Sequence, residues 1–108
     1  MKLTITEAAA RLYIKEMDLQ KGDCLRFFVR IGGVGSGGFS IGVMFDSPTE
    51  RAYIIKQDGV IFFVEEDDFW YLNGMEIHYD EDLGFLQIQS PSFENIDHPE
   101  EKSKQDAN

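Results

Sequence analysis

The feature that most constrains this chain is a stretch in which two apolar runs flank a segment dominated by glycine. Residues 26–31 read RFFVRI, residues 39–43 read FSIGV, and five of the seven residues between them, 32–38, are glycine. Glycine is used where the backbone needs a positive φ or passes close to another group, and it costs conformational entropy. The flanking runs are rich in aromatic and β-branched residues, so the pattern predicts a strand, a shaped loop and a second strand.

The length of 108 residues predicts one domain, and a hydrophobic content of 43% with 13% aromatic residues indicates a folded chain. No apolar run approaches the roughly 20 residues needed to span a bilayer. The first four residues lead directly into an amphipathic segment, without the apolar region of a signal peptide. We therefore expect a soluble protein in the cytoplasm.

The net charge is -10, from 20 acidic and 10 basic residues. Nucleic acids and anionic membranes are recognised by positively charged surfaces, so this balance disfavours both as partners. A basic protein or a cation fits the charge better. The single cysteine, Cys24, excludes an internal disulfide and any chemistry that needs several thiolates on one chain.

The hydrophobic periodicity predicts one amphipathic helix over residues 7–19, with Thr6 as its N-cap and Lys21-Gly22 closing it. Residues 65–68 are all acidic and precede a short helix over residues 69–72. Asp58-Gly59 is typical of a tight hairpin turn. Strands are predicted at residues 3–5, 23–31, 39–46, 51–56, 60–64, 75–80 and 85–89. The nearly continuous apolar residues Phe27, Phe28, Val29 and Ile31 predict that the first long strand is buried on both faces.

These elements predict an α+β fold with mixed or antiparallel sheets of about seven strands, one N-terminal amphipathic helix and one short helix. The hydrophobic pattern stops near residue 90. We therefore expect a folded domain over residues 1–92 and an acidic, disordered tail over residues 93–108.

Several segments resemble the HesB-like family, the A-type iron–sulfur cluster carrier and scaffold proteins. They are LTITEAA at residues 3–9, LRFFVR at residues 25–30 before the glycine loop, DGV at residues 58–60, LNGMEIHY at residues 72–79 and FLQIQSP at residues 85–91. Their order and spacing carry the resemblance, which spans residues 2–92. It implies a HesB-like fold.

In that family three cysteines hold iron or an iron–sulfur cluster, one in the glycine loop and two near the C-terminus. Here the loop position falls on Val34 or Gly35, residues 92–108 contain no cysteine, and Cys24 matches none of the three. A [2Fe–2S] or [4Fe–4S] cluster normally takes four thiolates, and a dimer of this chain would bring only two. The resemblance therefore implies the fold more firmly than the chemistry, and identifies a divergent member with a degenerate cysteine motif.

The glycine loop, Gly33, Val34, Gly35, Ser36 and Gly37, is thus the candidate cofactor position, with its ligand lost. Residues 33–38 also fit G-x-G-x-x-G, but a phosphate site of that type needs a helix after the loop, and a strand is predicted there. Cys24 and His78 are the candidate metal ligands. For Cys24 the alternative is a small hydrophobic side chain, and for His78 a solvated one.

No arrangement of residues with catalytic spacing stands out, so we do not expect an enzyme. Residues 65–68 are either a solvated helix start or an acidic docking patch. The aromatic residues 69–71 are a candidate interface anchor, although we expect at least two of them to pack into the core.

Two functions from different classes follow. The first is a binding or adaptor module of iron–sulfur biogenesis or iron handling, which recognises a protein partner and carries no cofactor. The second is a binder of iron or an iron–sulfur cluster that uses Cys24 from two chains, non-cysteine ligands or an external thiol. A small domain of unrelated role stays open, and the chain is expected to be a monomer or a homodimer.

Overall fold

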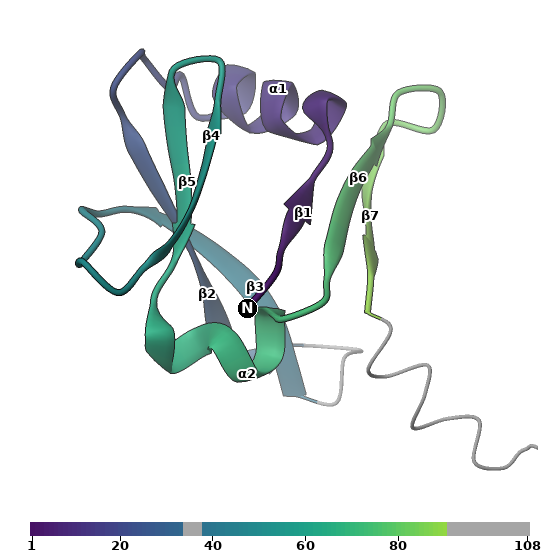
Figure 1. Cartoon of the computed structure of the whole chain (residues 1–108). Helices are drawn as coiled ribbons and strands as arrows, with labels where there is room; N and C mark the ends of the chain where they lie inside the picture. The colour runs from purple at the N-terminus through teal and green to yellow at the C-terminus, as the bar shows by residue number, and fades with distance from the viewer. Residues whose placement is uncertain (34–37, 91–108) are drawn as a thin grey trace, which may run out of the picture.

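The computed structural model describes residues 1–33 and 38–90. Along the chain the elements are β1 (Thr4–Ile5), α1 (Glu7–Glu16), β2 (Cys24–Gly33), β3 (Gly38–Phe45), β4 (Tyr53–Gln57), β5 (Val60–Val64), the 3-10 helix η1 (Glu66–Asp68), α2 (Phe69–Leu72), β6 (Glu76–Asp80) and β7 (Phe85–Gln89) (Figure 1). This confirms the predicted α+β fold with seven strands. The predicted tail over residues 93–108 lies outside the described residues.

The strands form two mixed sheets. A four-stranded sheet has the order β3-β2-β5-β4, in which β2 and β5 are parallel and the other pairs are antiparallel. A three-stranded sheet has the order β1-β6-β7, in which β1 and β6 are parallel. In Figure 1, α1 lies at the top between the two sheets and α2 lies at the bottom. Among the described residues, no helix is long and apolar enough to cross a membrane.

Helix α1 begins as predicted and ends earlier than predicted. The Thr6 hydroxyl accepts a hydrogen bond from the Ala9 N–H at 3.3 Å, as an N-cap does. The helix ends at Glu16 because Asp18 takes a positive φ of 51° and the Leu19 N–H turns back to the Ile14 carbonyl at 2.9 Å. This is the Schellman closure, here with aspartate in the place that glycine usually takes. The prediction that Lys21-Gly22 closes the helix was therefore wrong.

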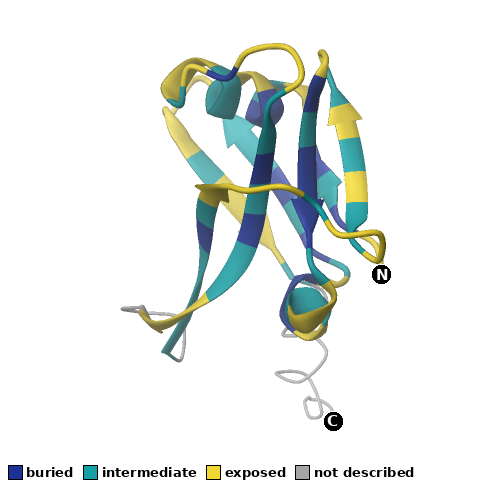
Figure 2. Cartoon of the chain, turned by 90° about the vertical axis from the view of Figure 1, so that its left-hand side faces the viewer, coloured by how far each residue is buried: buried dark blue, intermediate teal, exposed yellow. Residues whose placement is uncertain are grey.

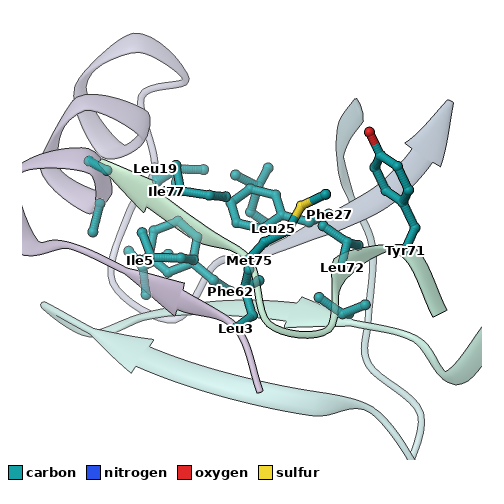
Figure 3. Close-up of a cluster of buried hydrophobic side chains, with 14 residues drawn as sticks. Leu3, Ile5, Leu19, Leu25, Phe27, Phe62, Tyr71, Leu72, Met75 and Ile77 are labelled. Atoms are coloured by element: carbon teal, nitrogen blue, oxygen red, sulfur yellow. The ribbon is translucent and has the colours of Figure 1, made fainter. Parts of the chain in front are cut away.

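The core fills the space enclosed by the two sheets, α1 and α2 (Figure 3). Its fully buried side chains include Leu25 and Phe27 from β2 and Phe62 from β5. The Tyr13 ring of α1 lies 5.2 Å from the Phe27 ring, and burial raises the pKa of the Tyr13 phenol above its usual value. The predicted turn between β4 and β5 is confirmed, since Asp58 and Gly59 both take positive φ, at 53° and 81°.

Strand β2 is longer than its neighbour β5, and among the described residues only the first half of β2 has a strand on both sides. β2 pairs with β5 from Cys24 to Phe27, where β5 ends at Val64, but it pairs with β3 as far as Gly33. Ile31 is consequently 85% exposed, and the end of the hairpin projects past the core (Figure 2). The expectation of burial on both faces was wrong at Ile31, because the neighbouring strand is too short to cover it.

The start of the chain is attached to the end of α2. The Lys2 N–H donates to the Asn73 side-chain carbonyl at 2.8 Å, and the Gly74 N–H donates to the Lys2 carbonyl at 2.7 Å. β1 then runs parallel to β6, with Ile5 opposite Ile77. These contacts join the smaller sheet to the bottom of the molecule.

Candidate functional site

The glycine segment closes the β2–β3 hairpin, as the sequence predicts. Gly33 pairs with Gly38, and the register shifts between Ile31 and Gly33. Gly32 and Gly38 both take positive φ, at 98° and 92°, which other residues rarely adopt. The remaining candidate residues of this loop, Val34, Gly35, Ser36 and Gly37, lie outside the described residues.

Cys24 lies at the opposite end of β2 from the glycine segment. At about 3.3 Å per residue, Cys24 and Gly33 are about 30 Å apart along the strand. The thiol is free and half-buried, and it donates a hydrogen bond to the Gly22 carbonyl, 3.9 Å from the sulfur. A thiolate at this position cannot reach a ligand held in the loop of the same chain.

His78 lies in β6, in the other sheet. Its Nε2 atom is 3.0 Å from the Glu76 carboxylate, two residues earlier on the same face of the strand, and its side chain is 35% exposed. Cys24 and His78 belong to different sheets, and within the described residues neither is part of a group of three side chains that could hold a metal ion.

The donor set does not fit an iron–sulfur cluster. Within residues 1–33 and 38–90, no group of three histidine, cysteine or carboxylate side chains is placed to hold a metal ion. The whole chain contributes one thiol, and the family's cluster needs several.

A charged cluster that sequence reasoning did not single out joins β2 to η1. The Arg26 guanidinium donates to the Asp46 carboxylate at 3.2 Å and to the Asp68 carboxylate at 3.3 Å. The other Asp68 oxygen accepts the Val29 N–H at 3.4 Å. Arg26 and Asp68 are 42 residues apart, and nothing in the sequence pairs them. This cluster fixes η1, and with it α2, beside the point where β2 loses its second neighbour.

The aromatic residues of α2 divide between the core and the surface. Tyr71 is buried, and Phe69 is partly buried against the core, which confirms that two of the three pack inward. Trp70 is 64% exposed and stands edge-on to the Phe39 ring of β3, with the ring centres 5.4 Å apart. Trp70 is the one tryptophan of the chain.

A family model described as "Iron-sulphur cluster biosynthesis" matches residues 1–98. The chain belongs to this family. The resemblance found in the sequence is thereby confirmed, including a cysteine motif that has lost its ligands.

Two curated relatives show how the family's members differ. The chain is 44% identical over 86 residues to the pyruvate dehydrogenase inhibitor of Bacillus subtilis (strain 168), covering 76% of this chain and 90% of that protein. It is 33% identical over 94 residues to the iron-sulfur cluster insertion protein ErpA of Francisella tularensis subsp. novicida, covering 83% and 80%. The family thus includes both an inhibitor and cluster proteins.

Solved structures support the fold. Escherichia coli SufA, involved in biosynthesis of iron-sulfur clusters, matches with a TM-score of 0.59 at 21% identity, over 84% of this chain and 87% of that one. IscA with a [2Fe-2S] cluster matches with a TM-score of 0.61 at 18% identity, over 83% and 86%. At these identities the likeness concerns the fold alone.

Proposed function

We propose that this protein acts by binding and inhibiting pyruvate dehydrogenase, without carrying a cluster of its own. The sequence alone favours a non-ligating module with a partner in iron–sulfur assembly. The 44% identity to a pyruvate dehydrogenase inhibitor keeps the non-ligating module and moves the proposed partner to that enzyme.

One observation carries the proposal. The only thiol of the chain, Cys24, lies at the far end of β2 from the glycine hairpin that resembles the family's ligand loop. A member that keeps the fold and lacks the donor set can act through its surface but not through a cluster.

The exposed side chains support binding to a protein. Tryptophan is enriched in binding hot spots. The chain exposes its tryptophan, together with other large apolar side chains of both sheets and of the turn before β7. Those at least half exposed are Ile31, Phe45, Trp70, Leu83 and Phe85.

The test is to titrate the purified chain into its own cell's pyruvate dehydrogenase complex and to follow NADH formation. We expect activity to fall with added protein, equally for the wild type and for Cys24→Ser, and in the presence of an iron chelator. The Cys24→Ser variant is the matched control, because it removes the one thiol and leaves the proposed interaction unchanged.

The opposite result is equally definite. It is found if anaerobic treatment with ferrous iron and sulfide gives stoichiometric iron and charge-transfer absorption in the wild type but neither in Cys24→Ser. That result, with no effect on pyruvate dehydrogenase, would overturn the proposal in favour of a cluster bound between two chains.

A further inference from the structure

We infer that one exposed surface, built around Trp70, is the docking site for a basic, extended segment of the partner protein. This inference rests on the proposed function, in that it needs a protein partner. The surface, called here the Trp70 surface, consists of Ile31, Phe39, Glu66, Asp67 and Trp70.

The apolar part of this surface is exposed but held in place. Trp70 packs edge-on against Phe39 and lies 5.5 Å from the Tyr71 ring. Ile31 is directly opposite Phe39 across the β2–β3 pair, so both side chains are on one face, and Ile31 is 85% exposed. A tryptophan fixed by its neighbours and open to solvent is typical of a binding hot spot.

The polar part of the surface is acidic. η1 and α2 follow each other without a break, and Glu66, Asp67 and Trp70 are all exposed. Glu66 and Asp67 precede Trp70 by four and three residues, the spacings at which residues are neighbours on a helix surface. Glu66 pairs with Arg51 at 3.5 Å, with both side chains largely in solvent. Asp67 is exposed and forms no ion pair within residues 1–33 and 38–90. Arg30 is exposed on the other face of β2 from Ile31.

The backbone of β2 beside this surface has a free side. The Ile61 N–H donates to the Asp23 carbonyl at 2.9 Å, which shows that the odd-numbered residues here direct their backbone groups toward β5. β5 ends opposite Phe27, and the Asp68 carboxylate accepts a hydrogen bond from the Val29 N–H. In the described part of the chain, Ile31 faces no strand on that side, so an extended segment can add there.

Charge decides which occupant fits. A lysine or arginine can lie over the Trp70 ring and pair with Asp67, while a neighbouring apolar side chain packs on Ile31. A second copy of this chain carries the same net charge of -10, and residues 93–108 carry five acidic and two basic groups. Both are repelled from an acidic surface, so the occupant is a basic segment of another protein.

The test uses the full chain and two double variants with the same change in charge. Glu66→Gln/Asp67→Asn removes the acids beside Trp70, and Glu81→Gln/Asp82→Asn removes two exposed acids from the turn after β6. Trp70→Leu keeps an apolar side chain and removes the aromatic ring. Circular dichroism confirms that each variant is folded, and inhibition of the pyruvate dehydrogenase complex is measured for each.

We expect the concentration for half-inhibition to rise at least tenfold for Glu66→Gln/Asp67→Asn and for Trp70→Leu, and to stay within twofold for Glu81→Gln/Asp82→Asn. If the wild type inhibits and all three variants match it, the Trp70 surface is wrong and the proposed function stands.

A second arm covers the case in which the wild type does not inhibit and the proposed function fails. The probe is a synthetic peptide of alternating arginine and leucine, and the readout is the fluorescence of Trp70 in the wild type and the two double variants. Binding that weakens tenfold only for Glu66→Gln/Asp67→Asn supports the surface. Equal binding by both double variants shows only general attraction to an acidic protein and overturns it.

Discussion

The two halves of β2 have similar sequences and opposite surroundings. Residues 24–27 lie between β3 and β5, and Leu25 and Phe27 there are fully buried. Residues 28–33 keep β3 alone, and Ile31 there is 85% exposed. Leu25, Phe27, Val29 and Ile31 lie on the same face of β2, so the difference comes from the length of β5. One strand therefore contributes to the core at one end and presents a surface at the other.

The largest effect that tests this comparison is expected at Phe27. Phe27→Ala removes a fully buried ring that packs on Tyr13 and Phe62, and should lower the free energy of unfolding by about 3–5 kcal/mol. Ile31→Ala is the control in the other half and should change it by about 0.5 kcal/mol or less. Urea unfolding followed by circular dichroism gives both values. Equal losses would show that the projecting half is covered in solution.

The next largest effect is expected at Asp68 of η1, which binds Arg26 in the first half of β2 and the Val29 N–H in the second half. Asp68→Ala leaves the Val29 N–H without its acceptor and Arg26 with one carboxylate instead of two, which should cost about 1–3 kcal/mol. Asp46→Ala, at the more exposed partner of Arg26, should cost about 1 kcal/mol or less. The reverse order of the two losses would show that η1 is held by other contacts.

A pH titration tests how Tyr13 of α1 packs against the buried half of β2. Burial raises the pKa of Tyr13, so the unfolded chain loses this proton first as the pH rises above about 10. Below that pH, the ionisation of Tyr13 takes nothing from the free energy of unfolding. Above it, the free energy of unfolding falls by up to about 1.4 kcal/mol per pH unit until Tyr13 also ionises in the folded chain. Tyr13→Phe should show a shallower decline in unfolding free energy between pH 9 and 11. The decline that remains in Tyr13→Phe includes the effect of Tyr71, whose pKa is also raised by burial.

A small effect is expected beside the projecting half, at Gly42 of β3, which pairs with Phe28. A Cβ atom at Gly42 would lie 2.6 Å from side-chain atoms of Phe28 and Arg30. Because these side chains are only partly buried or exposed and can move, Gly42→Ala should cost about 1 kcal/mol, the lower end for overpacking. Thermal unfolding measures this loss. A loss as large as that of Phe27→Ala would mean that the hairpin is packed as rigidly as the core.

The parts of the fold that depend on neighbouring residues could be predicted from the sequence. Thr6 caps α1 and Asp58-Gly59 forms a tight turn, because each device involves residues a few positions apart. The end of α1 was missed because Asp18 adopts the backbone conformation that the prediction assigned to a later glycine. The exposure of Ile31 could not be foreseen, since it depends on where β5 stops, at Val64, 33 residues later in the chain.

The same distinction between local features and long-range contacts applies to the candidate site. The glycine hairpin and the inward packing of two α2 aromatics follow from local pattern. The Arg26–Asp68 contact joins residues 42 positions apart, and no local pattern announces it. The proposed roles of Cys24 and His78 as metal ligands stay predictions for the iron reconstitution experiment.

The attachment of the N-terminus has a consequence for how the chain folds during synthesis. Lys2 is hydrogen-bonded to Asn73, 71 residues later, and β1 pairs with β6. β1 must therefore wait until β6 has been synthesised before it finds its partner, and contacts so distant in sequence slow folding. An N-terminal affinity tag would emerge beside Asn73, three residues after Trp70 in the chain, so fusions intended for binding studies belong at the other end of the chain.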